Sequence, residues 1–137
     1  MCSSDLNMAY HWAAAGKDFV LQTRVGSSDQ QLFVQFLERN RIPHLPASLV
    51  APGESSSIDI RFGADREPQM ENYVDGVWAE VHCTSEELDA LDRATHWHAV
   101  LVEGAIAELG RLSASGRLQG VTVSADFLGF QIGRAHV

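Results

Sequence analysis

The stretch WHAVLVEGAIAELGRL at residues 97–112, followed by VTVSA at residues 121–125, decides the fold class. Residues 97–102 form an apolar run that is typical of a buried parallel strand, and residues 105–112 repeat apolar side chains at helical spacing. The second stretch has the composition of another strand. A strand, a helix and a strand in this order form a β-α-β unit with parallel strands. The sequence therefore predicts an α/β fold.

The segments just upstream continue the alternation of helices and strands. Thr84 stands three residues before Glu87, which is the capping-box spacing that opens a helix. Apolar and charged side chains alternate at residues 58–62, which predicts a half-exposed strand, and residues 73–81 are expected to be its partner. Together the two strands predict a hairpin over about residues 56–81.

The first forty residues carry two helix patterns around one strand pattern. Residues 7–15 are rich in Ala and aromatic side chains and stop before Gly16, as a helix with a C-terminal glycine does. Residues 19–25 predict a strand, and residues 29–40 predict an amphipathic helix packed on the sheet. The large aromatic residues of these segments are expected in the core: Trp12, Phe33 and Phe36.

Composition limits the classes of function. The 137 residues are 45% hydrophobic and carry a formal net charge of -8, so we expect no nucleic-acid or membrane partner. Outside the first six residues Cys83 is the only cysteine, which favours a reducing compartment. No apolar run approaches the roughly 20 residues of a transmembrane helix. The expected protein is soluble and cytoplasmic.

The six residues at each end of the chain can be encoded by complementary nucleotide strings. Residues 132–137, IGRAHV, can be encoded by ATCGGAAGAGCACACGTC, and residues 1–6, MCSSDL, by a string that begins GTGTGCTCTTCCGATCT with GTG as the start codon. Its first 15 nucleotides are the reverse complement of ATCGGAAGAGCACAC in the other string. The string resembles a sequencing-library adapter. We therefore expect both ends to be adapter-like and residues 7–131 to be part of a longer domain. Coincidence at the ends of an ordinary short protein is the alternative.

Several motifs, in their order along the chain, resemble the PfkB (ribokinase-like) carbohydrate kinase family. Residues 7–9, NMA, match the end of the family's G-G-x-x-x-N-x-A motif, and residues 25–29, VGSSD, look like its V-G-D-D turn. Ser27 and Ser28 replace the acidic residues that are usual there. Residues 123–126, VSAD, resemble a later V-S-F-D strand end.

The middle of the chain resembles the fructoselysine kinase branch of this family. Residues 71–80, ENYVDGVWAE, followed by residues 85–87, SEE, are similar to the branch's D/E-G-V-x-A-D/E string and helix cap. The resemblance implies an incomplete ribokinase-like three-layer sandwich with a small β lid hairpin. It also implies an ATP-dependent kinase acting on a hydroxyl of a sugar or sugar-amine adduct such as fructoselysine. ATP and a divalent cation (Mg) would serve the full-length parent, and the lid could form a homodimer.

The resemblance assigns two substrate contacts and no catalytic residue to this chain. Asn7 matches the sugar-contacting Asn of the family motif, and Glu103 stands directly after a strand, where α/β sheets bind ligands. We expect both side chains to face one cleft, with the hairpin beside it. The family's G-A-G-D motif, which supplies the catalytic Asp and the phosphate-binding amides, does not occur in the sequence. The chain alone is therefore expected to be inactive.

The residues alone suggest two other interpretations, a zinc site and a non-catalytic binding domain. Four residues could be assembled into a zinc site, but they lack the paired short spacings of structural zinc motifs, so we expect no metal site. They are His82, Cys83, His96 and His98. A non-catalytic α/β nucleotide- or ligand-binding domain would show the same β-α-β periodicity and remains an alternative function.

Overall fold

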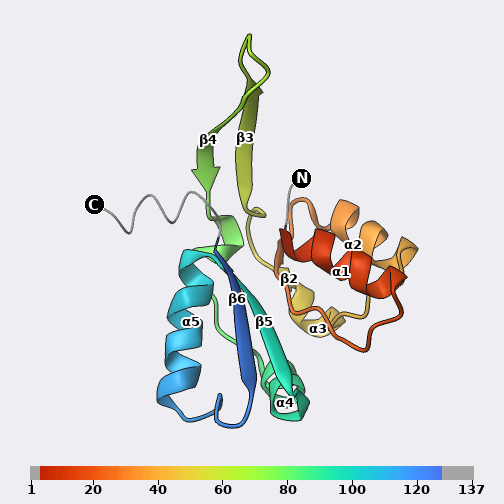
Figure 1. Cartoon of the computed structure of the whole chain (residues 1–137), viewed down its shortest axis with the longest axis vertical. Coiled ribbons are helices and arrows are strands. Elements are labelled where there is room, and N and C mark those ends of the chain that lie inside the picture. Colours follow the sequence, from red (N-terminus) through yellow and green to blue (C-terminus); the bar gives the residue numbers. More distant parts are fainter. Residues whose placement is uncertain (1–3, 128–137) are drawn as a thin grey trace.

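The computed structural model describes residues 4–127, which fold into helices and three separate two-stranded sheets (Figure 1). The elements in chain order are α1 (Ser4–Ala14), β1 (Val25–Gly26), α2 (Gln30–Arg39), α3 (Pro46–Leu49), β2 (Val50–Ala51), β3 (Ser57–Phe62), β4 (Pro68–Val74), the 3-10 helix η1 (Gly76–Trp78), α4 (Ser85–Arg93), β5 (His96–Leu101), α5 (Glu103–Ala114) and β6 (Thr122–Phe127). This mixed composition confirms the predicted α/β class. The three-layer sandwich stays a prediction, because the strand pairs do not join into one sheet within these residues. No helix in the same range is long and apolar enough to cross a membrane.

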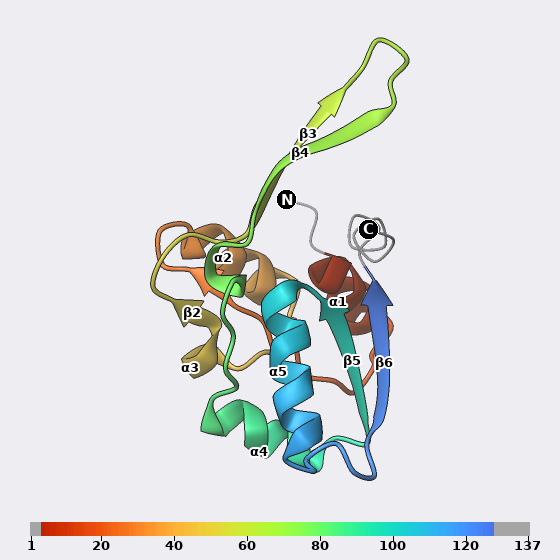
Figure 2. The same cartoon turned by 90° about the vertical axis from the view of Figure 1, so that its left-hand side faces the viewer.

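The predicted β-α-β unit is present in the C-terminal third. β5 and β6 pair in parallel, from His96 opposite Thr122 to Leu101 opposite Phe127, and α5 connects the two strands. Figure 2 shows α5 lying along one face of the pair. Leu101 is buried, but the rest of β5 is half-buried or exposed, although the sequence predicted a buried strand. The difference arises because, in the part of the chain that the structure describes, only one edge of β5 has a partner.

A capping box starts α4, as the sequence predicts. The Glu87 amide donates to the Thr84 hydroxyl oxygen at 3.3 Å, and the Thr84 amide donates to the Glu87 carboxylate at 2.8 Å. The backbone amides of Thr84 and Glu87 would otherwise lack a hydrogen-bond partner at the start of α4. Leu91, one helical turn further, is only 2% exposed and anchors the helix.

A long antiparallel hairpin of β3 and β4 projects from the body of the molecule (Figures 1 and 2). Ile60 lies opposite Met70, and Phe62 lies opposite Pro68. Paired residues in an antiparallel ladder present their side chains on the same face. The hairpin therefore carries an apolar face, and three of these side chains are 39–71% exposed: Ile60, Phe62 and Met70.

The second hairpin strand lies earlier in the chain than the sequence indicated. Residues 73–81 were expected to form it, whereas β4 ends at Val74 and η1 follows. The strand ends because Gly76 has a left-handed φ of 54°. A side chain at Gly76 would also meet the Glu54 carbonyl oxygen, 2.4 Å from the position of a Cβ.

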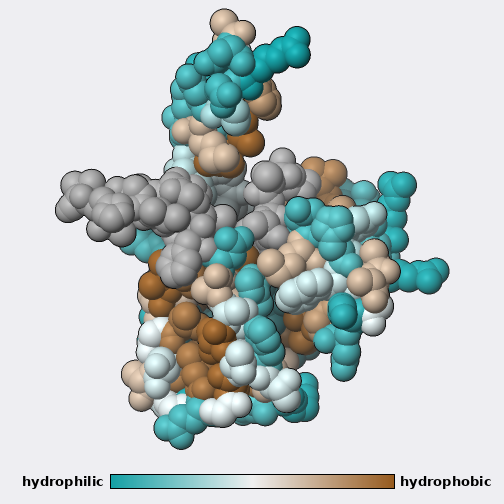
Figure 3. Space-filling view, viewed as in Figure 1, coloured by the Kyte–Doolittle hydropathy of each residue, from teal (hydrophilic) through white to brown (hydrophobic). Residues whose placement is uncertain are grey.

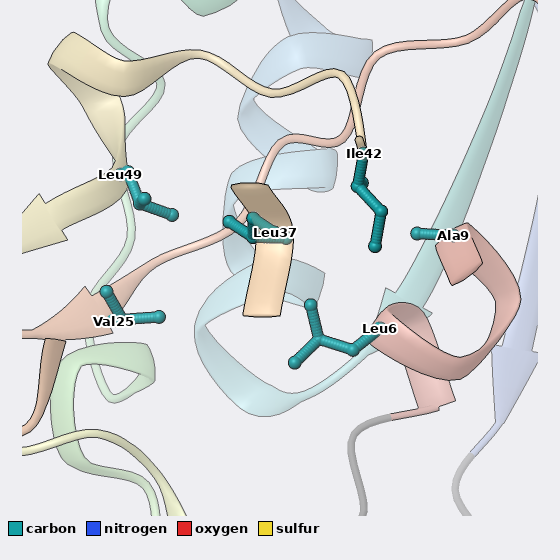
Figure 4. Packing of buried hydrophobic residues seen from close by; sticks show 6 residues of the cluster. All are labelled: Leu6, Ala9, Val25, Leu37, Ile42 and Leu49. Carbon is teal, nitrogen blue, oxygen red and sulfur yellow. The ribbon is translucent and has the colours of Figure 1, made fainter. Parts of the chain in front are cut away.

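The N-terminal half packs around a small apolar core between α1, α2 and the β1–β2 pair (Figure 4). Its buried members are Leu6, Ala9, Val25, Leu37, Ile42 and Leu49. Phe33 and Phe36 pack against this core as expected. Trp12 was also expected there and is instead 37% exposed. α1 begins three residues before the predicted start, and Leu6, within the adapter-like residues, is buried in the core.

The segment at residues 19–25, expected to be a strand, is extended but forms little ladder. Only Val25–Gly26 counts as a strand, in parallel with β2, and Leu21 makes one isolated parallel bridge to His44. A ladder needs hydrogen bonds from a neighbouring backbone. Within residues 4–127 the segment finds such a neighbour on one side only.

Candidate functional site

The carboxyl end of β5 lies beside the base of the hairpin (Figure 2). Val102 is the N-cap of α5, and Glu103 is the first residue of that helix, with an exposed side chain. Glu103 therefore follows a strand directly, as the sequence predicts. Its negative charge acts on the phenol of Tyr73, near the end of β4, and raises the pKa of that phenol.

Gly104 holds this end of α5 against η1. Gly104 is buried, and a Cβ built on it would lie 2.1 Å from the Trp78 carbonyl oxygen and 3.1 Å from a Val81 methyl group. Only glycine permits such an approach of two backbones. The Trp78 indole N–H donates in turn to the Arg24 carbonyl at 3.1 Å. Glu103 is thereby fixed next to the hairpin base.

Tyr73, Asp75 and Glu103 form what we call the hairpin-base cluster. Burial raises the pKa of Tyr73 to about 12, and the charge and hydrogen bond of Asp75 and the charge of Glu103 add to this effect. The phenol therefore keeps its proton at neutral pH. The cluster offers one hydroxyl and two carboxylates, which are the donors and acceptors that polyhydroxyl ligands require.

Sequence reasoning found one member of this cluster and missed two. Residues 71–80 carry a family resemblance, but their pattern predicts no role for Tyr73 or Asp75. A usable signal was present, because Tyr73 lies near the end of β4 and Asp75 directly precedes Gly76. Polar side chains on a strand end that is fixed by its neighbours are common binding residues.

Asn7 lies beside residues that line a large hollow. It sits in the first turn of α1 with an exposed side chain. Leu6 and Met8 line a hollow of about 1190 Å³, and so does Val102, whereas neither Asn7 nor Glu103 is among its lining residues. The structure thus places both predicted sugar contacts next to residues that line the same hollow. Their common contact with a substrate stays a prediction.

A buried ion pair ties α4 to the N-terminal half. Both guanidinium nitrogens of Arg24 donate to the Glu87 carboxylate, one of them at 2.6 Å, and the two side chains are 10% and 3% exposed. Arg24 also donates to the Ser48 carbonyl at 2.8 Å and to the His82 carbonyl at 3.0 Å. The hydrogen bond to Glu87 raises the pKa of Arg24, although burial alone would lower it.

A second carboxylate organises the loop before α4. Glu108 accepts from the Cys83 amide at 2.7 Å and from Arg111 at 2.6 Å, and Arg111 donates to the Val81 carbonyl at 2.7 Å. Burial raises the pKa of Cys83 to about 12, and the charges of Glu87 and Glu108 act in the same direction. A thiol that stays protonated at neutral pH is a poor nucleophile. Cys83 is therefore a packing residue.

The four residues weighed as metal ligands are dispersed. His96 Nε2 and His98 Nδ1 both contact the Ser124 hydroxyl oxygen, at 2.7 and 2.8 Å. His82 lies on a different segment, with its Nε2 3.2 Å from a Glu80 carboxylate oxygen. Between residues 4 and 127, no group of three or more His, Cys, Asp or Glu side chains is arranged to hold a metal ion.

Comparison with known proteins relates the chain to other proteins through structure alone. No model of a protein family matches it, and no curated protein is significantly similar in sequence. It is similar to the structure of Burkholderia thailandensis nucleoside kinase in complex with inosine, with a TM-score of 0.61 and 13% identity over 90% of this chain. It is also similar to the crystal structure of Sa239, with a TM-score of 0.60 and 18% identity over 88% of this chain.

The chain spans 38% and 40% of the lengths of these two proteins. At such low identities the similarity shows the fold alone. Within that limit, the chain shares the α/β fold of about two fifths of a nucleoside kinase.

Proposed function

We propose that the chain is part of an ATP-dependent kinase of the PfkB (ribokinase-like) type, which phosphorylates a hydroxyl of a sugar or sugar-containing substrate. The observation that carries the proposal is the fold similarity to a nucleoside kinase across 90% of the chain. In this interpretation residues 7–131 form part of a three-layer sandwich, and the β3–β4 hairpin is its lid. The hairpin projects beside the carboxyl end of β5, where a lid over a substrate would be needed (Figure 2).

The surface supports the proposal that further elements cover this chain in a longer protein. In Figure 3 hydrophobic side chains gather over α5 and β6, where Ile106 is 47% and Val123 is 38% exposed. Contiguous apolar surface on a soluble protein usually marks a face that another element or partner covers. The apolar surface over α5 and β6 is explained if the remaining layers of a kinase domain pack on this face.

The hairpin-base cluster supplies the substrate contacts in this proposal. Glu103 and Asp75 accept hydrogen bonds from sugar hydroxyls, the Tyr73 phenol donates or accepts one, and Asn7 contributes from α1. The described residues do not fit ATP or a divalent cation, because they form neither a three-ligand group nor the family's phosphate-binding motif. This chain's role is therefore limited to holding the substrate, and phosphate transfer belongs to the rest of the protein.

Two substrate classes fit this site. Fructoselysine and related sugar-amine adducts come first, because residues 71–80 and 85–87 resemble that branch of the family. A nucleoside comes second, because the nucleoside kinase with a similar fold was solved in complex with inosine. Both carry several sugar hydroxyls, and they differ in the charged amine or planar base that is attached.

The experiment that tests this proposal is a titration of the ¹⁵N-labelled chain with fructoselysine, inosine or ribose, followed by amide chemical shifts. We expect shifts at the hairpin-base cluster with one of the first two ligands, and a loss of affinity of about tenfold or more in Glu103→Ala, since a charged hydrogen bond contributes about 1.5–3 kcal/mol. Asp89→Asn, an exposed carboxylate on α4, is the matched control. Unchanged shifts at the cluster with all three ligands would contradict the proposal.

We also propose that the apolar face of the hairpin pairs with a second copy in the longer protein. Phe62 and Met70 are 71% and 60% exposed on it, which is unusual for adjacent large apolar side chains. Sedimentation velocity of the chain should show dimers that Phe62→Ser abolishes and the hairpin-tip variant Glu67→Gln does not. A monomer at all concentrations would contradict this contact.

A further inference from the structure

Two histidines of β5 converge on one hydroxyl group. His96 Nε2 lies 2.7 Å and His98 Nδ1 lies 2.8 Å from the Ser124 hydroxyl oxygen. Residues two positions apart on a strand present their side chains on the same face, and Ser124 lies opposite His98 in the parallel β5–β6 ladder. The ladder therefore holds two imidazole nitrogens around a single point on one face of the strand pair.

The two imidazoles differ in how firmly they are held. His98 is half-buried, and its ring meets the Trp12 ring edge-to-face, with the ring centroids 6.1 Å apart. Its Nε2 is buried and has no hydrogen-bond partner among residues 4–127, so in this range the ring makes its hydrogen bond through Nδ1. His96 is exposed, and its ring has room to turn. The pair thus combines a fixed nitrogen with an adjustable one that solvent reaches.

One hydroxyl group cannot donate to both of these nitrogens. It has a single proton, so when it donates to one imidazole the other imidazole must donate a proton of its own to the hydroxyl oxygen. A divalent metal ion, in contrast, accepts a lone pair from both nitrogens at once. Histidine is the commonest metal ligand in proteins, and its nitrogens bind zinc at about 2.0–2.1 Å. Because both nitrogens already lie near one atom, a turn of the exposed His96 ring brings them onto one ion.

We propose that His96 and His98 form a two-histidine site for a divalent ion from the end of the first transition series, with water in the remaining positions. Imidazole ligands suit such ions, among them Ni²⁺, Cu²⁺ and Zn²⁺. The site differs from the structural zinc motif that the sequence argues against, because that motif needs four protein ligands. It also does not involve His82, whose ring contacts Glu80 on a different segment. The proposal does not rest on the proposed function, because Mg²⁺ prefers oxygen ligands.

Titration of the full 137-residue chain with Ni²⁺ alone tests the proposal. Isothermal calorimetry should show binding that EDTA reverses, and Mg²⁺ should give no binding heat. His96→Asn and His98→Asn should each weaken the tightest Ni²⁺ site at least about tenfold, because a single imidazole then remains to hold the ion. His82→Asn, the matched control, should change the affinity less than about twofold. An unchanged affinity in both β5 variants would overturn the proposal, and so would a loss in His82→Asn alone.

Nuclear magnetic resonance locates the ion without any variant, which covers the case in which His98→Asn does not fold. Less than one equivalent of Ni²⁺ should broaden the amide signals of residues 95–99 and 123–125 before those of other residues. Broadening that begins at residues 1–3, next to Cys2, or at residues 80–83 would place the ion elsewhere and overturn the proposal. No broadening at any residue would overturn it too. The experiment uses neither ATP nor sugar, so the kinase proposal and the metal proposal can fail separately.

Discussion

Arg24 and Glu87, 63 residues apart in the chain, form a buried ion pair that joins the extended N-terminal segment to α4. Glu87 also closes the capping box of α4 through Thr84. One carboxylate thus satisfies a helix start and a buried guanidinium at the same time. Because Trp78 donates to the Arg24 carbonyl, the pair also fixes the base of the hairpin.

Removing Arg24 should be strongly destabilising. Arg24→Ala leaves the Glu87 carboxylate buried without its cation, and the expected loss in the free energy of unfolding is about 3–5 kcal/mol. Arg117→Ala, which breaks a pair with Asp92 whose side chains are 39% and 53% exposed, should cost less than about 1 kcal/mol. Urea unfolding followed by circular dichroism measures both. If Arg24→Ala does not fold, Arg24→Met combined with Glu87→Gln, which keeps an acceptor for the Thr84 amide, should restore folding, and equal losses for the two Ala variants would contradict the argument.

Two glycines of the same helix should respond oppositely to alanine. Gly104→Ala forces a Cβ to within 2.1 Å of the Trp78 carbonyl oxygen, so α5 or η1 must shift and the protein loses stability. Gly110 lies further along α5 with no atom within 4 Å of its Cβ position, and Gly110→Ala should stabilise by about 0.5–1 kcal/mol. Thermal unfolding of the pair measures the contrast. A Gly104→Ala protein as stable as Gly110→Ala would show that the close approach is absent.

The elements that the sequence predicted are those whose signals are local. The capping box of Thr84 and Glu87 and the alternating apolar residues of β3 need only a few neighbouring residues to be recognised. The β-α-β unit needs only its order along the chain. The second hairpin strand was misplaced because its end depends on the backbone conformation of Gly76, which the pattern of apolar residues does not contain.

The features that the sequence did not predict depend on tertiary contacts. Residues 19–25 have strand composition, but a ladder depends on a neighbour that the described chain supplies on one side only. Glu103 and the base of the hairpin come close together because Gly104 lets α5 approach η1, a contact between segments about 26 residues apart. Glu103 was found because its position after a strand is visible in the sequence.

Acid should weaken the fold partly through Glu108. Burial alone would raise its pKa, but the hydrogen bonds from Cys83 and Arg111 outweigh burial and leave the pKa below the ordinary 4.5. A lowered folded-state pKa contributes stability above the unfolded value, and this contribution is lost as the pH falls through the folded value. Glu108→Gln should therefore be less stable at pH 7 and lose less stability between pH 5 and 3. Urea unfolding between pH 7 and pH 3 measures the free energy of unfolding of this variant. The control is Glu38→Gln, which replaces an exposed carboxylate on α2 and should leave the pH dependence of that free energy unchanged.

The phenol of Tyr73 reports directly on its neighbours. Its pKa of about 12 should be visible as a late phase in the ultraviolet absorbance titration, and Tyr73→Phe should remove that phase. Glu103→Gln removes a negative charge beside the phenol and should shift the phase to lower pH, because ionisation then meets less repulsion. Asp89→Asn, on α4, should leave the phase in place. A phase that does not move in Glu103→Gln would separate Glu103 from the hairpin-base cluster.

In the proposed longer kinase, Glu103 gives the sharpest test of substrate binding. Glu103 is the first residue of α5, behind which β5 and the contact of Gly104 with Trp78 hold the backbone in place. If Glu103 accepts hydrogen bonds from substrate hydroxyls, Glu103→Ala removes about 1.5–3 kcal/mol of binding, which is roughly a 10- to 150-fold rise in the sugar KM. The KM for ATP should change little, because the resemblance assigns phosphate binding to a G-A-G-D motif that does not occur in this sequence. Steady-state kinetics with each substrate varied separately distinguishes the two constants. Equal changes in both would indicate that the substitution disturbs the fold, and unchanged sugar kinetics would make Glu103 an exposed helix-end carboxylate with no part in binding.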